Sequence, residues 1–432
     1  CSIMKLVAVR MTHLTLHFPR VSWKSVILLS LLLVLGPSWA LDNGLGLTPP
    51  MGWNSWNHFH CDIDEILIQQ TAQALIDLGL DRLGYQYINL DDCWQIRRNA
   101  SGYIEEDTNK FPSGIPALAE YVHALGLKFG LYSDAGIRTC QGRPGGLGYE
   151  KEDATTYSEW NIDYLKYDNC FNLGMDVHTR YQRMHDALNQ TGHPIYFSLC
   201  EWGYKDPATW AREVGNSWRT TADIDATWAS IMKNLDLNDR WHAFAGPGGW
   251  NDPDMLQVGN GKLTVAEQRS HFTLWCLTKA PLLLGNDVRD LLSLSVAKST
   301  TVGNVLEIVT NQELIAWNQD ALGKQGYKRY SSGGRMGEEQ DEERSADDNG
   351  ALEVWAGELS GGNIALVLFN RSNKDQNITA FWKDIGLEPG TQALARDVWL
   401  HQDLGTVQDS ITSMVASHDV VAIQLSPYSN LL

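Results

Sequence analysis

The stretch Tyr164-Leu-Lys-Tyr-Asp-Asn-Cys170 has the pattern of a buried strand that ends in a carboxylate. Side chains alternate along a strand, so Tyr164, Lys166 and Asp168 are expected to share one face. Two residues of strand place Lys166 roughly 6 to 7 Å from Asp168, close enough for the ammonium to keep the carboxylate ionised. A carboxylate nucleophile has these surroundings, but so does a structural ion pair at a strand end. Only the rest of the chain can distinguish the two.

Eight short apolar runs, each ending in polar or aromatic residues, alternate with helix-like stretches from Pro50 onward. The alternation predicts a parallel α/β protein, and eight strands close a (β/α)8 TIM barrel. In such a barrel the active site lies at the carboxyl ends of the strands, where these polar residues fall. The runs are Met51–Trp56, Tyr87–Trp94, Lys128–Asp134, Tyr164–Cys170, Ile195–Trp202, Ser217–Asp223, Gly248–Met255 and Ala280–Asp287. Amphipathic helices are predicted at Ile66–Leu78, Pro116–Leu125 and Val265–Leu274.

After Trp317 the sequence changes to short apolar segments separated by Gly, Asn and Asp turns. About a hundred residues of this pattern predict a C-terminal antiparallel β-sandwich. We therefore expect a catalytic barrel over residues 41–322 and a sandwich over 323–432, with a disordered acidic loop at 331–349. The predicted strands of the sandwich are Glu353–Trp355, Ile364–Phe369, Ile378–Trp382, Asp397–Trp399 and Val420–Leu425.

The N-terminal segment has the pattern of a signal peptide. Basic residues as far as Lys24 precede an apolar run over 26–35, and Ser38-Trp-Ala40 has small residues at the two positions that a signal peptidase reads. We expect cleavage after Ala40, because the run is too short to span a bilayer. The mature chain should then follow the secretory pathway to the extracellular space, the cell wall or the vacuole, without membrane association.

Charge and cysteine content agree with an extracytoplasmic protein. The 52 acidic and 34 basic residues give a net charge of −18, which argues against a nucleic-acid partner. Six cysteines follow Cys1, and in an oxidising compartment they allow fifteen full pairings. Four sequons for N-glycosylation begin at Asn99, Asn189, Asn370 and Asn377.

Six motifs, in matching order and spacing, make the chain resemble the α-galactosidases of glycoside hydrolase family 27 (the melibiases), most closely the plant-type members. The resemblance covers nearly all of residues 41–432. The motifs are Met51-Gly-Trp-Asn-Ser-Trp56, Asp91-Asp-Cys-Trp94, Lys166-Tyr-Asp-Asn-Cys170, Cys200-Glu-Trp202, Arg219-Thr-Thr-Ala-Asp223 and Asp252-Pro-Asp-Met255.

The resemblance implies a retaining double displacement that releases terminal α-galactose from oligosaccharides, galactomannans or galactolipids. Asp168 matches the family's nucleophile and Asp223 its acid/base residue. Retaining enzymes hold these two carboxyl groups about 5 to 5.5 Å apart. Taken without the resemblance, Asp223 and Asp225 could be an ordinary loop or helix-cap pair.

Other positions match residues of the family that contact galactose. Asp91 and Asp92 correspond to the partners of the 4- and 6-hydroxyls, and adjacent strand residues can both reach a ligand only if the strand ends there. Cys200 and Trp202 match positions near the 2-hydroxyl, where the bulk of Glu201 and Trp202 is expected to exclude an N-acetyl group. The remaining matches are Trp56, Tyr132, Lys166, Arg219 and Asp254, although a single aromatic among them would more often be a core residue.

The family also implies disulfides between Cys61 and Cys93 and between Cys140 and Cys170. Relatives outside the plant-type group pair the Cys200 position with a cysteine just before the acid/base strand. This chain has Gly215 and Asn216 there, so Cys200 is expected to be a free thiol.

No metal or other cofactor is expected. The segment His58-Phe-His-Cys61 has ligand-type residues, but no second histidine and carboxylate set stands at a recognised metal spacing. The expected partner is an α-galactoside, bound by a monomer or a homodimer. Two alternatives remain open from the sequence: a β-L-arabinopyranosidase of the same family, and a galactose-binding protein without activity.

Overall fold

The computed structural model describes residues 43–296, 300–332 and 351–428. The predicted signal peptide lies outside these residues, as does the predicted acidic loop from residue 333 onward. Side chains between 293 and 304 are also not described. Within the described residues, no helix has both the length and the apolar character needed to cross a membrane.

Eight parallel strands form one sheet, in the spatial order β10-β1-β2-β5-β6-β7-β8-β9. The segment after β9 meets β10 through a parallel bridge between Leu256 and Leu284, with the Leu256 amide donating to the Leu283 carbonyl at 2.9 Å. The strands are β1 (Met51–Asn54), β2 (Tyr87–Asn89), β5 (Lys128–Asp134), β6 (Tyr164–Asp168), β7 (Tyr196–Leu199), β8 (Ser217–Arg219), β9 (Trp250–Asp252) and β10 (Leu282–Leu284). Each of the eight predicted runs contains one of them, which confirms the predicted TIM barrel.

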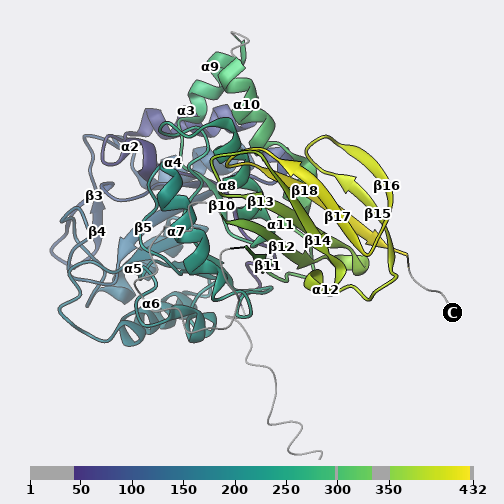
Figure 1. Ribbon diagram of the computed structural model, residues 1–432. Helices are drawn as coiled ribbons and strands as arrows, with labels where there is room; N and C mark the ends of the chain where they lie inside the picture. Colours follow the sequence, from purple (N-terminus) through teal and green to yellow (C-terminus); the bar gives the residue numbers. More distant parts are fainter. Residues whose placement is uncertain (1–42, 297–299, 333–350, 429–432) are drawn as a thin grey trace, which may run out of the picture. The chain divides into compact units, whose positions relative to one another are not determined.

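The helices lie between these strands in the chain, except for the last three, which follow β10 (Figure 1). They are α2 (Trp56–Phe59), α3 (Glu65–Asp77), α4 (Ile115–Ala124), α5 (Glu150–Glu159), α6 (Val177–Thr191), α7 (Trp228–Asp239), α8 (Val265–Leu277), α9 (Val288–Val296), α10 (Thr300–Val309) and α11 (Gln312–Asn318). The three predicted helices correspond to α3, α4 and α8. Side-chain caps fix helix starts: Asp64 accepts from the Leu67 amide at α3, and Thr264 with Glu267 forms a capping box at α8.

Strand β6 has the predicted alternation of side chains. Leu165 and Tyr167 belong to the main hydrophobic core, whereas Tyr164 packs in a separate small cluster with Tyr87 and Tyr196. The rings of Tyr164 and Tyr196 stack with centroids 4.9 Å apart. On the face that Tyr164 shares with Lys166 and Asp168, the aromatic cluster therefore precedes the polar residues along the strand.

The C-terminal region is antiparallel, as predicted. A six-stranded sheet has the order β11-β12-β13-β18-β15-β16, and β14 pairs with β17. The elements are β11 (Tyr327–Ser331), β12 (Leu352–Glu358), β13 (Ile364–Asn370), β14 (Gln376–Phe381), α12 (Trp382–Ile385), β15 (Gln392–Asp397), β16 (Gln402–Gln408), β17 (Ser410–Val415) and β18 (Val420–Pro427). The predicted strand at Asp397–Trp399 is wrong, because β15 already ends at Asp397.

Both expected disulfides are present, Cys61–Cys93 and Cys140–Cys170, while Cys200 and Cys276 are buried free thiols. Three sequon asparagines, Asn99, Asn189 and Asn377, are exposed. Asn370 is fully buried, and its side-chain amide donates to the carbonyls of Lys374, Val415 and Ala416. Asn370 therefore cannot carry a glycan in this fold.

Candidate active site

A cavity of about 470 Å³ opens at the carboxyl ends of the barrel strands. It gathers nine of the eleven predicted site residues into one place. The segments after β1 and β2, together with β5, supply Trp56, Asp91, Asp92 and Tyr132. Strands β6 and β8 and the segments after β8 and β9 supply Lys166, Asp168, Arg219, Asp223 and Asp254. The volume falls in the range of small-molecule sites.

Asp168, the last residue of β6, is only 6% exposed and is held by hydrogen bonds on both oxygens. The Tyr132 hydroxyl donates to Oδ2 at 2.7 Å, and the Asn169 amide donates to Oδ1 at 3.0 Å. Tyr132 reaches this position because β5 and β6 pair in parallel, with Tyr132 opposite Lys166 and Asp134 opposite Asp168. The carboxylate is thus fixed in one orientation at the cavity wall.

Lys166 forms its ion pair with a residue that follows β2, separated from β6 by β5, and not with a residue of its own strand. Its Nζ donates to Asp91 Oδ2 at 2.9 Å, although its charge still acts on Asp168. Burial opposes the charged ammonium, but Asp91 and the other negative groups nearby, Asp168 and Asp254 among them, together outweigh burial and raise the pKa of Lys166 above its ordinary value. The alternation in β6 was predicted correctly, whereas the direct partner of Lys166 was not.

Asp91 and Asp92 both line the cavity, and β2 ends two residues before them at Asn89. The strand therefore ends early enough for adjacent side chains to reach one ligand, as expected. Asp91 Oδ2 also accepts from the Asn54 amide at 2.8 Å. Asp92 accepts from the backbone amides of Cys93 at 2.7 Å and Gln141 at 3.0 Å.

Asp223 lies in the segment after β8, and its side chain is 73% exposed. The guanidinium of Arg219 bridges two carboxylates, with Nη2 3.1 Å from Asp223 Oδ1 and 3.0 Å from Asp254 Oδ2. Arg219 is buried, so this bridge joins the base of the site to its open rim. The Ile224 amide, directly after Asp223, also donates to Asp254 Oδ2, at 2.9 Å.

The two candidate catalytic carboxyl groups have different proton affinities. Burial raises the pKa of Asp168 to about 6, although Lys166 and Tyr132 oppose the rise and the charge of Asp223 adds to it. For Asp223 the partial burial would raise the pKa, but Arg219 and Lys166 outweigh it and lower the pKa. The substrate-free site thus titrates as a pair in which Asp168 has the higher pKa.

The segment after β7 differs from the expectation. Cys200 is buried behind the main cavity, 3.6 Å from Arg219 Nη1, where it lines a small space of about 20 Å³. Neither Trp202 nor Glu201 is among the residues that line either space. Glu201 is fully buried, and burial raises its pKa well above the ordinary value. The expected steric exclusion of an N-acetyl group by Glu201 therefore has no basis in this geometry.

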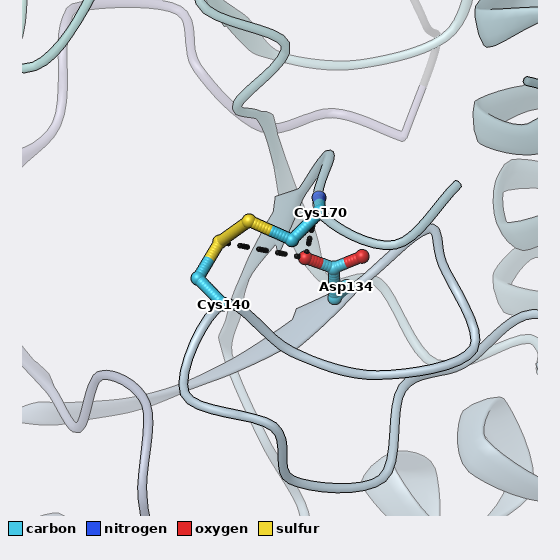
Figure 2. A group of neighbouring side chains, drawn as sticks. All are labelled: Asp134, Cys140 and Cys170. Atoms are coloured by element: carbon cyan, nitrogen blue, oxygen red, sulfur yellow. Dashed lines mark hydrogen bonds between the residues drawn. A yellow bond between two sulfur atoms is a disulfide. The ribbon is translucent and has the colours of Figure 1, made fainter. Parts of the chain in front are cut away.

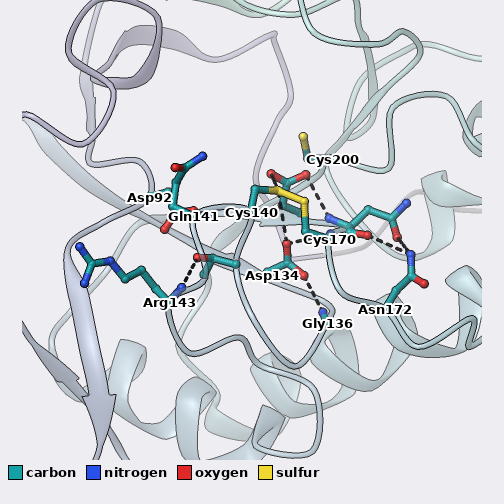
Figure 3. Close-up of a disulfide and its surroundings, with 12 residues drawn as sticks. Asp92, Asp134, Gly136, Cys140, Gln141, Arg143, Cys170, Asn172 and Cys200 are labelled. Carbon is teal, nitrogen blue, oxygen red and sulfur yellow. Dashed lines mark hydrogen bonds between the residues drawn. A yellow bond between two sulfur atoms is a disulfide. The ribbon is translucent and has the colours of Figure 1, made fainter.

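Asp134 lies beside the Cys140–Cys170 disulfide (Figure 2). Its carboxylate accepts from the amides of Gly136 at 2.6 Å and Cys170 at 2.9 Å. Burial and the charge of Asp168 raise the pKa of Asp134 to about 9. Asp134, Cys140 and Cys170 are close enough to hold an ion, but sulfurs joined in a disulfide are not thiolate ligands. The group instead anchors the turn that carries Gln141 to Asp92 (Figure 3).

Several polar residues of the cavity were not predicted from the sequence. They are Asn57, His58, His60, Asp225, Gln257 and Asn260. Asn57 to His60 follow Trp56 directly, and Gln257 and Asn260 follow the Asp252–Met255 motif. Their nearness to recognised motifs was the only signal that could have marked them, because amides and lone histidines in loops are usually structural.

Two carboxyl groups that differ in exposure and in pKa, at the open end of a TIM barrel, form an arrangement that a glycoside hydrolase can use. The family model "Alpha galactosidase A" matches residues 48–320, and the model of the α-galactosidase C-terminal β-sandwich domain matches 349–425. The chain belongs to the α-galactosidases of glycoside hydrolase family 27.

Individual relatives support the same family membership. An α-galactosidase from Oryza sativa is 51% identical over 390 residues, which cover 90% of this chain and 87% of the relative. The crystal structure of α-galactosidase I from Mortierella vinacea superposes with a TM-score of 0.80 at 36% identity, over 89% of this chain and 98% of that one. The α-galactosidase from Saccharomyces cerevisiae solved with raffinose has a TM-score of 0.80 at 30% identity, over 89% and 99% of the two chains.

Proposed function

We propose that this protein is a retaining exo-α-galactosidase that removes terminal α-galactose from oligosaccharides and related galactosides. The observation that carries the proposal is the pair Asp168 and Asp223 on one cavity, one buried and hydrogen-bonded, the other at the open rim. Raffinose, bound in the yeast relative, is an example of the substrate class. Turnover of 4-nitrophenyl α-galactoside by the purified protein tests the proposal, and absence of turnover would leave a galactose-binding protein.

In the first step Asp168 attacks the anomeric carbon and forms a β-linked galactosyl ester, while Asp223 gives its proton to the departing oxygen. Tyr132 holds one Asp168 oxygen, which leaves the carboxylate oriented for attack. In the second step Asp223 takes a proton from water, and the hydroxide attacks the anomeric carbon from the opposite face and displaces Asp168 as a free carboxylate. Galactose leaves with its α configuration, and Asp223 is protonated again.

The first expected result concerns pH. The reactive form carries a single proton, on Asp223, while Asp168 is ionised. This form is present only between the two macroscopic pKa values of the pair, the lower of which Arg219 depresses and the higher of which is about 6. The kcat/KM for an α-galactoside should therefore be bell-shaped and should fall as pH rises through about 6. A profile that is flat up to pH 8 would contradict the assignment.

The second expected result concerns the sugar. A β-L-arabinopyranoside lacks the 6-hydroxymethyl group that Asp92 is proposed to bind, so Asp92 would lose its ligand partner. Since a missing group in a fitted site costs on the order of 10- to 200-fold, kcat/KM for the 4-nitrophenyl arabinopyranoside should be at least about tenfold lower than for the galactoside. In Asp92→Ala, the kcat/KM values for the galactoside and the arabinopyranoside should differ by a smaller factor. Equal or faster turnover of the arabinopyranoside would favour the arabinopyranosidase alternative.

The domain limits at 41–322 and 323–432, the secretory route and a monomeric or homodimeric state remain part of this proposal. The three exposed sequons and the two disulfides support an extracytoplasmic compartment. Mass determination of the secreted protein would test cleavage after Ala40.

A further inference from the structure

Gln257 lies in the segment after β9, is 4% exposed and lines the cavity, and each of its two side-chain amide atoms is bonded within the protein. Its Nε2 donates to the Ile224 carbonyl at 3.0 Å, and its Oε1 accepts from Asn260 Nδ2 at 2.9 Å. The second amide hydrogen of Asn260 has its own acceptor, the Gly285 carbonyl after β10, at 3.0 Å. The Gln257 side chain thus links the Ile224 backbone to Asn260.

The backbone of Gln257 is anchored separately. Its amide donates to Nε2 of His271 on α8 at 3.0 Å. Burial of His271 lowers its pKa to about 3, so the ring is neutral and accepts this bond through Nε2 at any pH of interest. The ring also packs edge-on against Trp275, with centroids 4.1 Å apart. Gln257 therefore connects the acid/base segment to α8, a long buried element of the barrel.

The Gln257 side chain bonds the residue next to Asp223. The Ile224 amide is held by Asp254 and its carbonyl by Gln257, so both polar backbone groups of Ile224 are fixed. Asp254 also pairs with Arg219 and is proposed to contact the sugar, so its contacts change when substrate binds. Both side-chain amide atoms of Gln257, by contrast, are bonded to other protein groups. The Asp223 side chain is 73% exposed and is bonded by Arg219, while the bonds of Ile224 hold the backbone next to it.

We propose that Gln257 is a positioning residue that holds the acid/base Asp223 in line with the leaving oxygen. The inference rests on the proposed role of Asp223. A misplacement of about 1 Å costs on the order of 10²-fold, and general acid catalysis as a whole contributes about 10²- to 10⁴-fold. The loss should appear only for substrates whose leaving group needs a proton.

The test is Gln257→Met, which keeps the length and apolar volume but loses both amide bonds. We expect kcat/KM for methyl α-galactoside to fall roughly tenfold or more, because methanol departs only with a proton. For 2,4-dinitrophenyl α-galactoside it should stay within about threefold, because that leaving group departs as an anion. The methyl group is too small to contact Gln257, so a loss of leaving-group contacts would not produce this pattern. The ratio of the two substrates within one preparation does not depend on the folded fraction.

Two further variants complete the design. Gln325→Met removes an equally buried glutamine that accepts from Asn251 and does not line the cavity, and it should leave the ratio unchanged. Asp223→Ala should change the ratio more than Gln257→Met does. A parallel loss on both substrates in Gln257→Met, or an unchanged ratio, would overturn the role of Gln257 while Asp223→Ala still shows the dependence. If Asp223→Ala also shows no dependence, the proposed function of Asp223 is wrong.

Discussion

Asp168→Gly should lower kcat/KM for every α-galactoside by on the order of 10⁴-fold or more, as removal of other enzymatic nucleophiles does. The substitution removes the attacking oxygen and leaves Tyr132 without its acceptor, but it changes neither Asp223 nor Arg219. The space beneath the anomeric carbon is then open. Azide should enter it and displace an activated leaving group once, with inversion, to give β-galactosyl azide.

The azide product is the decisive measurement for Asp168. Formation of β-galactosyl azide, identified by NMR, requires an open face opposite the leaving group, and the activated leaving group departs without a proton. Unmutated enzyme should release α-galactose as its first product. An α-azide from Asp168→Gly would mean that the roles of the two aspartates are exchanged, and β-galactose as the first product would rule out retention.

The barrel and most of its site were predictable because both follow from local sequence patterns. Each strand is a short apolar run, and the polar residues after it must lie at the carboxyl edge of a parallel sheet. That rule places Asp91 and Asp168 at the edge, while their proposed roles come from the resemblance to the family. Asp223 could be recognised only through the resemblance to the family, because it is four residues past the end of β8 and looks like an ordinary loop aspartate.

Contacts between residues from different strands were not predictable. The alternation in β6 places Lys166 and Asp168 on one face, but it cannot reveal that Asp91, 75 residues earlier, lies closer to the ammonium. Glu201 shows the same limit, because a residue between two motif positions was expected near the ligand and is instead fully buried. Contacts between strands depend on register and tilt, which periodicity does not encode.

Strand β16 was not predicted either, for a different reason. Strand β16 is largely exposed, so its residues Gln402–Gln408 lack the apolar alternation that marks a half-buried strand. Gln257 and Asn260 were missed because an amide in a loop carries no chemical signature. Their role becomes visible only when the acceptors Ile224 and Gly285, distant in sequence, are located.

Asp223→Ala should separate substrates by their leaving groups. With 2,4-dinitrophenyl α-galactoside, Asp168 still attacks and kcat/KM should stay within about tenfold, whereas methyl α-galactoside should lose the full contribution of acid catalysis, about 10²- to 10⁴-fold. Azide should intercept the galactosyl-enzyme from the face that water uses and yield α-galactosyl azide. Asp225→Ala, a carboxylate loss in the same segment and at the same cavity, should show no such dependence on the leaving group.

The pH profile of Asp223→Ala provides an independent check with a sign that can be derived. Only Asp168 now has to be ionised, and its pKa lies at or below about 6 because the charge of Asp223, which raised it, is gone. The ionised fraction grows as pH rises through that value and then stays constant. For the activated galactoside, kcat/KM should therefore climb to a plateau on the alkaline side, where the unmutated enzyme declines. A bell-shaped profile in this variant would show that another group supplies the proton and that Asp223 is not the acid.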